Sequence, residues 1–220
     1  MRPRKKKNLP ERMEACADLW IKQPEQQRGR WRELFPESDR LSVELGCGKG
    51  TFICTLAARE PQNCFVAVEK VPDVLVMAME KAEQMQLKNL RFVSADAKDI
   101  EDIFAPDEID ALYINFCDPW HKKRHYKRRL TYRGFLERFS RVLRQDALLQ
   151  FKTDNAPLFE FSLPEFEAAG YETVSMTRDL HALGDESNIV TEYEANFSAK
   201  GFAINRLIAR NARRPVDCEK

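Results

Sequence analysis

Five acidic residues stand at or just beyond the ends of short apolar runs in this 220-residue chain: Glu44, Glu69, Asp96, Asp118 and Asp154. A carboxylate near the end of a buried strand is costly unless it meets a cation or hydrogen-bond donors. Glu69 could accept both hydroxyls of a ribose, and Asp96 could accept an adenine amino group or cap a following helix. Together with Glu44 they fit a nucleoside that carries a positive charge, which indicates S-adenosylmethionine as a cofactor.

The glycine-rich segment after the first apolar run would let the backbone come close to such a ligand. Gly46, Gly48 and Gly50 stand between a predicted strand and a predicted helix, where glycine permits a tight turn. A dinucleotide-binding fingerprint would need its third glycine at the position of Thr51. An NAD enzyme is therefore the least favoured interpretation, although a glycine turn alone is weak support for any ligand.

A dense basic block follows Asp118. After Pro119 and Trp120, the seven lysines and arginines of this block are Lys122, Lys123, Arg124, Lys127, Arg128, Arg129 and Arg133. Such a run is often only a solvated face, but here it adjoins the predicted reaction centre. Phosphates bound by these side chains would hold a nucleic acid against the cofactor. The sequence therefore predicts contact with nucleic acid, with His121 and His125 as RNA contacts or surface residues.

The apolar periodicity predicts a single α/β domain over residues 36–220, preceded by a basic extension over residues 1–35. Helices are expected between most of seven strands, which are predicted at 41–45, 63–68, 89–94, 109–116, 147–153, 171–176 and 201–209. This alternation is typical of a mostly parallel sheet with helices on both faces, here with a C-terminal antiparallel hairpin. Ligands of such sheets bind beyond the carboxyl ends of the strands, where the five acids would meet.

The composition narrows the class of protein and of site. The chain has 36 lysines and arginines against 35 aspartates and glutamates, so its net charge of +1 conceals local basic clusters. No apolar run approaches the roughly 20 residues of a membrane helix, so no membrane association is expected. The six cysteines form no CxxC pair, which argues against a metal site and favours reduced thiols in a cytoplasmic protein.

Several segments resemble those of the bacterial tRNA (guanine-N7-)-methyltransferases, over most of the chain. The matching segments are 44–50, 68–69, 95–97, 115–120, 122–125, 151–155 and 191–194. The most specific are the Asp-Pro-Trp sequence at 118–120 with its basic run and the Thr-Glu-Tyr-Glu sequence at 191–194. The resemblance implies a Rossmann-like class I methyltransferase fold, S-adenosylmethionine as methyl donor and a guanine in the variable loop of tRNA as acceptor.

The resemblance also implies roles for individual residues, among which Asp118 is the catalytic residue. The implied cofactor-binding residues are Glu44, Gly46, Gly48, Glu69, Asp96, Ala97 and Asp118. The implied substrate-binding residues are Lys122, Asp154, Thr191, Glu192, Tyr193 and Glu194. The implied RNA-binding residues are Arg124, His125, Tyr126, Lys127, Arg128 and Arg129.

The chemistry of guanine N7 suits these residue types, since N7 has a lone pair and no proton to lose. Methyl transfer then needs positioning and stabilisation of the migrating positive charge, which Asp118 could supply, rather than a general base. Asp154 or Glu194 could accept hydrogen bonds from the guanine N1–H and amino group.

Two other functions stay open. One is a methyltransferase that acts on an exocyclic amine, because segment 115–120 loosely resembles the motif of those enzymes. The other is a non-catalytic RNA-binding domain on the same fold. The expected partner is tRNA, and the protein is expected to be a monomer or a homodimer.

Overall fold

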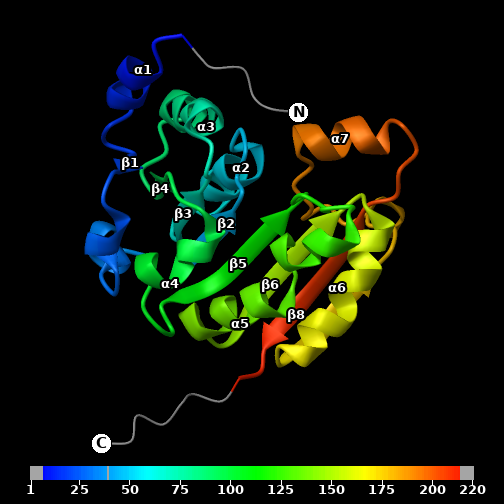
Figure 1. Cartoon of the computed structure of the whole chain (residues 1–220). Helices are drawn as coiled ribbons and strands as arrows, with labels where there is room; N and C mark the ends of the chain where they lie inside the picture. Colours follow the sequence, from blue (N-terminus) through cyan, green and yellow to red (C-terminus); the bar gives the residue numbers. More distant parts are fainter. Residues whose placement is uncertain (1–6, 39, 214–220) are drawn as a thin grey trace, which may run out of the picture.

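A central sheet of eight strands organises the molecule, shown in Figure 1 as a computed structural model that describes residues 7–38 and 40–213. The strands are β1 (Trp20–Ile21), β2 (Leu41–Leu45), β3 (Cys64–Val68), β4 (Leu90–Val93), β5 (Ile109–Asn115), β6 (Leu143–Thr153), β7 (Tyr171–Thr177) and β8 (Asn205–Asn211). Their order is β1-β4-β3-β2-β5-β6-β8-β7. Strands β1 to β6 pair in parallel, and β8 lies antiparallel between β6 and β7.

This topology confirms the predicted mostly parallel α/β sheet with its C-terminal antiparallel hairpin. The sheet has one strand more than the seven predicted, because Trp20 and Ile21 pair in parallel with Phe92 and Val93 at the edge. A strand of two residues is too short to show a period in the sequence, which explains why it was not expected.

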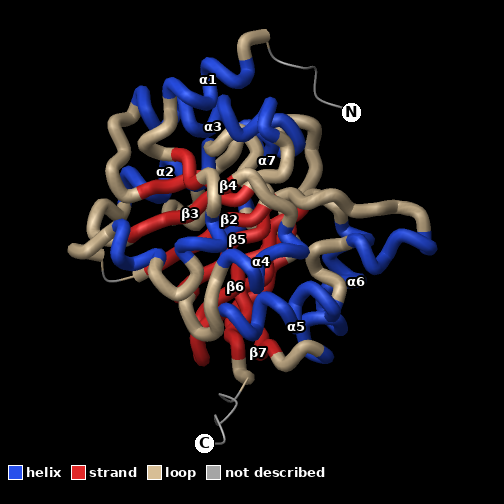
Figure 2. The backbone as a smooth tube through the Cα atoms, turned by 60° about the vertical axis from the view of Figure 1, so that its left-hand side comes forward, coloured by secondary structure: helices blue, strands red, loops and turns tan. Residues whose placement is uncertain are grey.

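Helices cover both faces of the sheet (Figure 2). The α-helices are α1 (Leu9–Ala15), α2 (Thr51–Arg59), α3 (Pro72–Gln84), α4 (Ile100–Ile103), α5 (Arg133–Val142), α6 (Ala156–Ala168) and α7 (Glu192–Ser198). Short 3₁₀ helices are η1 (Pro24–Gln27), η2 (Trp31–Leu34), η3 (Ala97–Asp99), η4 (Lys123–Arg128) and η5 (His181–Leu183). Helices α1, α2 and α3 bury one apolar cluster against the sheet, and α4, α5 and α6 bury the other.

Helix α7 has a different position from the covering helices. It lies beyond the carboxyl ends of the parallel strands, at the upper right of Figure 1. Ring contact between Tyr193 of α7 and Phe116, which directly follows β5, joins this helix to the end of the sheet. The strand ends and α7 therefore enclose the region where ligands of parallel sheets bind.

Residues 7–35 pack against the rest of the chain. The Trp31 side chain is fully buried, its Nε1 donates to the Ile103 carbonyl oxygen at 2.9 Å, and its ring lies 5.3 Å from that of Phe104. Trp31 thus belongs to the core, while the boundary at residue 36 stays a prediction. The basic residues 2–6 of the N-terminal tail lie outside the described residues. Among residues 7–38 and 40–213, no helix is long and apolar enough to cross a membrane.

Candidate active site

Two adjoining pockets open beyond the carboxyl ends of the central strands, with volumes of about 320 and 650 Å³. Gly46 and Phe116 line both, so the two form one continuous site. The smaller pocket is lined by five further predicted site residues, Glu44, Gly48, Thr191, Glu192 and Tyr193. The larger pocket is lined by six others, Glu69, Asp96, Ala97, Asp118, Lys127 and Arg128. All seven predicted cofactor-binding residues therefore lie in this site.

The glycine turn brings backbone N–H groups to the end of β3. Gly46 N and Cys47 N donate to the Val68 carbonyl oxygen at 2.8 and 3.2 Å. Gly50 follows with φ +76°, and a Cβ built on it would lie 2.7 Å from Ala78 Cβ on α3. Glycine is therefore required at position 50 by both the left-handed backbone and the close approach of α3.

Glu69 stands where a ribose-binding acid was predicted. Its Oε2 accepts from Gly48 N at 3.2 Å, and its Oε1 accepts from Val71 N at 3.0 Å. These two bonds hold the carboxylate at the pocket wall, and each oxygen keeps a second lone pair for a ligand hydroxyl. The alternative pairing with Lys70 is not among the ion pairs of the described residues.

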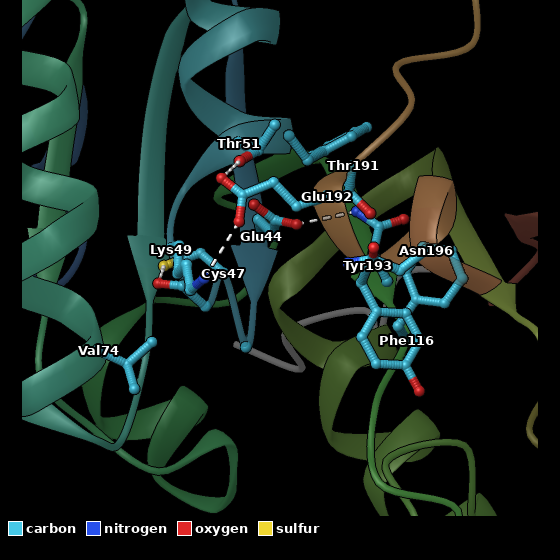
Figure 3. A pocket seen from close by; sticks show the side chains of 14 residues that line it. Glu44, Cys47, Lys49, Thr51, Val74, Phe116, Thr191, Glu192, Tyr193 and Asn196 are labelled. Carbon is cyan, nitrogen blue, oxygen red and sulfur yellow. Dashed lines mark hydrogen bonds and ion pairs between the residues drawn. The ribbon is translucent and has the colours of Figure 1, made fainter. Parts of the chain in front are cut away.

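Glu44 is the acid with an unmet hydrogen-bonding requirement. It is 2% exposed, its Oε1 accepts from Asn115 Nδ2 at 2.9 Å, and its Oε2 is buried without a partner (Figure 3). Burial raises the pKa of Glu44 to about 7, against the opposing effects of the Asn115 hydrogen bond and the Lys152 charge. An unpartnered carboxylate oxygen in a pocket wall suits a ligand ammonium group, which would supply the missing donor and charge.

Asp96 fills one of the two roles considered from the sequence, the helix cap, and its predicted contact with adenine stays a prediction. Its Oδ1 caps η3 by accepting from Lys98 N at 3.1 Å, and the residue also lines the larger pocket. Asp96, Ala97 and Glu69 thus stand in the same pocket, which fits an adenosine moiety. With Glu44 in the smaller pocket, this set of carboxylate acceptors fits the nucleoside and the amino-acid end of S-adenosylmethionine.

Asp118 is exposed at the larger pocket, on a loop whose backbone is strained on both sides. Phe116 and Trp120 have φ of 54° and 44°, in the left-handed region that non-glycine residues rarely adopt. Each such residue costs about 1–3 kcal/mol and persists only where its surroundings hold it. Arg129 is one such restraint, since its Nε donates to the Pro119 carbonyl oxygen at 2.9 Å.

The basic block divides into inward and outward side chains. The Arg129 guanidinium stacks on the Phe161 ring at 4.3 Å, and the Arg128 guanidinium lies 5.0 Å from the Trp120 ring. The exposed members among the described side chains include Lys122, Arg124, Tyr126, Lys127 and Arg128. Arg129 thus holds the loop of Asp118, while its role in RNA binding and that of the exposed members stay predictions.

The first turn of α7 supplies the other wall of the smaller pocket. Thr191 caps the helix, because its hydroxyl accepts from Glu194 N at 3.0 Å. The Tyr193 ring lies 5.0 Å from that of Phe116. Partial burial raises the pKa of Tyr193, and the negative charges of Asp154 and Asp118 add to this. Asp118, Asp154 and Tyr193, which are far apart in the sequence, are therefore close enough in the fold for the two carboxylates to act on the tyrosine.

Glu194 differs in position from the other predicted substrate residues, because its side chain is fully buried. Its carboxylate pairs with Lys152 Nζ at 2.8 Å, His181 Nε2 at 2.9 Å and Asn188 Nδ2 at 2.7 Å. Burial alone would raise the pKa of Glu194, but the Lys152 charge and these hydrogen bonds lower it. The buried ion pair fastens α7 to β6, and contact between Glu194 and the acceptor base stays a prediction.

Lys152 is the functional candidate that sequence reasoning missed. Its ammonium lies 5.5 Å from the Phe52 ring and 5.8 Å from the Phe116 ring, and both of these residues line the smaller pocket. The available signal was a lysine inside the apolar strand 147–153, a place where a charge needs a buried partner. Within the described part of the chain, no group of three histidine, cysteine, aspartate or glutamate residues could hold a metal ion.

Comparison with known proteins agrees with this geometry. Residues 38–207 match a protein family described as "Putative methyltransferase". The chain is 44% identical over 206 residues to a tRNA (guanine-N(7)-)-methyltransferase of Geobacillus sp. (strain WCH70), covering 94% of each chain. A protein of the same name from Lachnoclostridium phytofermentans is also 44% identical, over 92% of this chain and 96% of the relative.

Solved structures share the fold at low sequence identity. The 16S rRNA methyltransferase KamB aligns with a TM-score of 0.63 and 15% identity, over 83% of this chain and 92% of its own. A structure described as an antibiotic-related methyltransferase aligns with a TM-score of 0.64 and 18% identity, over 83% and 93% of the two chains. These similarities show the class I methyltransferase fold of this chain.

Proposed function

The chain belongs to the tRNA (guanine-N(7)-)-methyltransferase family, and we propose that it transfers a methyl group from S-adenosylmethionine to N7 of a guanine in the variable loop of tRNA. The observation that carries this proposal is the position of Asp118, which lines the larger pocket and is followed at once by the basic block. We place the reaction in the cytoplasm, with the protein as a monomer or a homodimer.

Separate residues would bind each part of the cofactor. Glu44 receives the ammonium group, Glu69 the ribose hydroxyls, and Asp96 with Ala97 the adenine. When bound, S-adenosylmethionine supplies an electrophilic methyl group on a sulfonium. The protein therefore needs to orient the guanine N7 lone pair in line with that methyl group, and needs no general base.

The proposed role of Asp118 is to stabilise the positive charge that moves during methyl transfer. As the methyl group moves, positive charge shifts toward the guanine ring, and a carboxylate about 4 Å away attracts it by about 4 kcal/mol at an effective dielectric constant of 20. Only the part of this attraction that is larger in the transition state than with bound cofactor accelerates the reaction. Contacts that hold this strained loop, such as the hydrogen bond from Arg129 to the Pro119 carbonyl oxygen, would keep the Asp118 carboxylate in place for that task.

The tRNA would be held from two sides. Exposed side chains of the basic block bind backbone phosphates, which gives a salt-dependent affinity without sequence information. Asp154 and the first turn of α7, with Thr191 and Tyr193, face the acceptor base. In this arrangement Asp154 accepts from the guanine N1–H and amino group, and an Asp154→Asn variant with unchanged kinetics and base preference would contradict that role.

The test is methyl transfer from labelled S-adenosylmethionine to unmodified bulk tRNA, followed by nucleoside analysis. The proposal predicts 7-methylguanosine with the unmodified protein and a large loss of this product with Asp118→Ala. An N-methylated exocyclic amine as product would point to the alternative reaction. Absence of both cofactor binding and methyl transfer in folded protein would favour a non-catalytic RNA-binding domain.

A further inference from the structure

Glu192, in the first turn of α7, places its carboxylate among donors from the glycine turn, α2 and α3. Lys49 Nζ lies 3.2 Å from Glu192 Oε2, and Lys81 Nζ lies 3.6 Å from Oε1. The Thr51 hydroxyl lies 3.5 Å from Glu192 Oε1 and accepts from Lys81 Nζ at 2.6 Å. The hydrogen bond from Lys49 lowers the pKa of Glu192. The three donors form a binding place for a carboxylate, and a side chain of the protein fills it.

This place lies inside the smaller pocket, since Lys49, Thr51 and Glu192 all line it together with Glu44 (Figure 3). The amino-acid end of the cofactor carries an ammonium and a carboxylate group. Glu44 offers a buried oxygen without a partner for the ammonium. A carboxylate in the same pocket needs hydrogen-bond donors or a positive charge. Lys49 is the one cationic side chain among the described residues of the pocket lining, and the Thr51 hydroxyl is a donor beside it.

We infer that Lys49 and Thr51 bind the α-carboxylate of the cofactor, and that Glu192 occupies this place until the cofactor displaces it. The inference rests on the proposed function, because it concerns the same cofactor. The displacement has a low energetic cost, since the Lys49 and Glu192 side chains are 55% and 53% exposed and such pairs are weak.

Displacement of Glu192 would also affect binding of the acceptor base. Glu192 stands between Thr191 and Tyr193, which line the same pocket and which the proposed function assigns to the acceptor base. The far side of this turn stays fastened, because Glu194 is buried in its ion pair with Lys152. Cofactor binding therefore frees one side of the first turn of α7 while the helix remains anchored. By linkage, this couples cofactor affinity to acceptor affinity.

The test compares two ligands by isothermal titration calorimetry. S-adenosylhomocysteine has the amino-acid end, and 5′-methylthioadenosine lacks it. The variants are Glu192→Gln, Lys49→Gln and the double variant, with Glu186→Gln as a control that removes the same charge from the exposed loop before α7. Each variant is first checked for native unfolding behaviour.

The inference predicts opposite effects for the two partners. Glu192→Gln should tighten S-adenosylhomocysteine binding about two- to fivefold, the range expected when an exposed pair no longer competes. Lys49→Gln should weaken it about tenfold, as loss of a charge-assisted hydrogen bond does. In the Lys49→Gln background, the gain from Glu192→Gln should shrink. Binding of 5′-methylthioadenosine should change by less than about twofold throughout.

Three results would overturn the inference. The first is a Glu192→Gln variant with unchanged or weaker S-adenosylhomocysteine binding. The second is an equal change for 5′-methylthioadenosine, and the third is the same gain in Glu186→Gln, since both would indicate a general charge effect. An unmodified chain that is folded but binds neither ligand would instead overturn the proposed function, and the inference with it.

Discussion

Replacing Glu44 by glutamine should stabilise the cofactor-free protein in a pH-dependent way. Burial raises the pKa of Glu44 from its ordinary value of 4.5 to about 7 in the folded chain. Between these values the folded chain binds the proton more tightly than the unfolded chain does. The contribution of Glu44 to stability is therefore present at low pH and declines as the pH rises toward 7 and above.

The size of the effect follows from the two pKa values. One unit of pKa difference corresponds to about 1.4 kcal/mol. From about pH 5.5 to about pH 8, ionisation of Glu44 should cost the folded state roughly 2 kcal/mol more than it costs the unfolded state. Glutamine carries no charge and can still accept from Asn115 Nδ2, so the Glu44→Gln variant should not show this loss.

The assay is urea unfolding of the cofactor-free protein at both pH values. The free energy of unfolding of Glu44→Gln, relative to the unmodified chain, should rise by roughly 2 kcal/mol from about pH 5.5 to about pH 8. The exposed Glu167→Gln variant on α6 controls for loss of a surface carboxylate. S-adenosylhomocysteine should bind the Glu44→Gln variant more weakly. Equal pH dependence in the variant and the unmodified chain would refute the reasoning.

Three further changes test other parts of the structure. Gly50→Ala should lower the free energy of unfolding, measured in urea, by more than Gly170→Ala does. Both glycines have positive φ, but of the two only Gly50 has a backbone neighbour within 3.0 Å of an added Cβ. Equal losses in the two variants would contradict this explanation. Lys152→Met should lower the free energy of unfolding by about 3–5 kcal/mol, because it leaves Glu194 charged and buried. Adding Glu194→Gln should restore part of this free energy in the same assay. A double variant as unstable as Lys152→Met would contradict the role of the ion pair. Arg129→Ala should lower kcat in steady-state methyl transfer with little change in the KM for tRNA, since its guanidinium holds the loop of the reaction centre; a change in KM alone would assign it to RNA binding.

The positions of the pocket acids could be predicted because a parallel sheet brings the carboxyl ends of its strands together. Glu44, Glu69, Asp96 and Asp118 are far apart in sequence, yet all line the two adjoining pockets. The prediction needed only the ends of the strands, which apolar runs indicate well, and the position of the acidic residue relative to each strand end.

The contacts made by α7 could not be predicted in this way. The helix follows an irregular segment, and nothing in the local pattern distinguishes Glu192, at the pocket wall, from Glu194, which is fully buried. Their difference arises from tertiary partners: Lys49 across the pocket for Glu192, and Lys152 on β6 for Glu194. For the same reason, the basic block gave no sign that Arg129 turns inward.

The central claim is that guanine N7 in the variable loop of tRNA accepts the methyl group, and one substitution in the RNA tests it directly. A tRNA carrying 7-deazaguanine at the target position has a C–H group in place of N7 and keeps the Watson–Crick edge of guanine. The account predicts that this tRNA binds with the affinity of unmodified tRNA and takes up no label from S-adenosylmethionine, while the guanine-containing tRNA is methylated. Equal methylation of the two tRNAs would contradict the account.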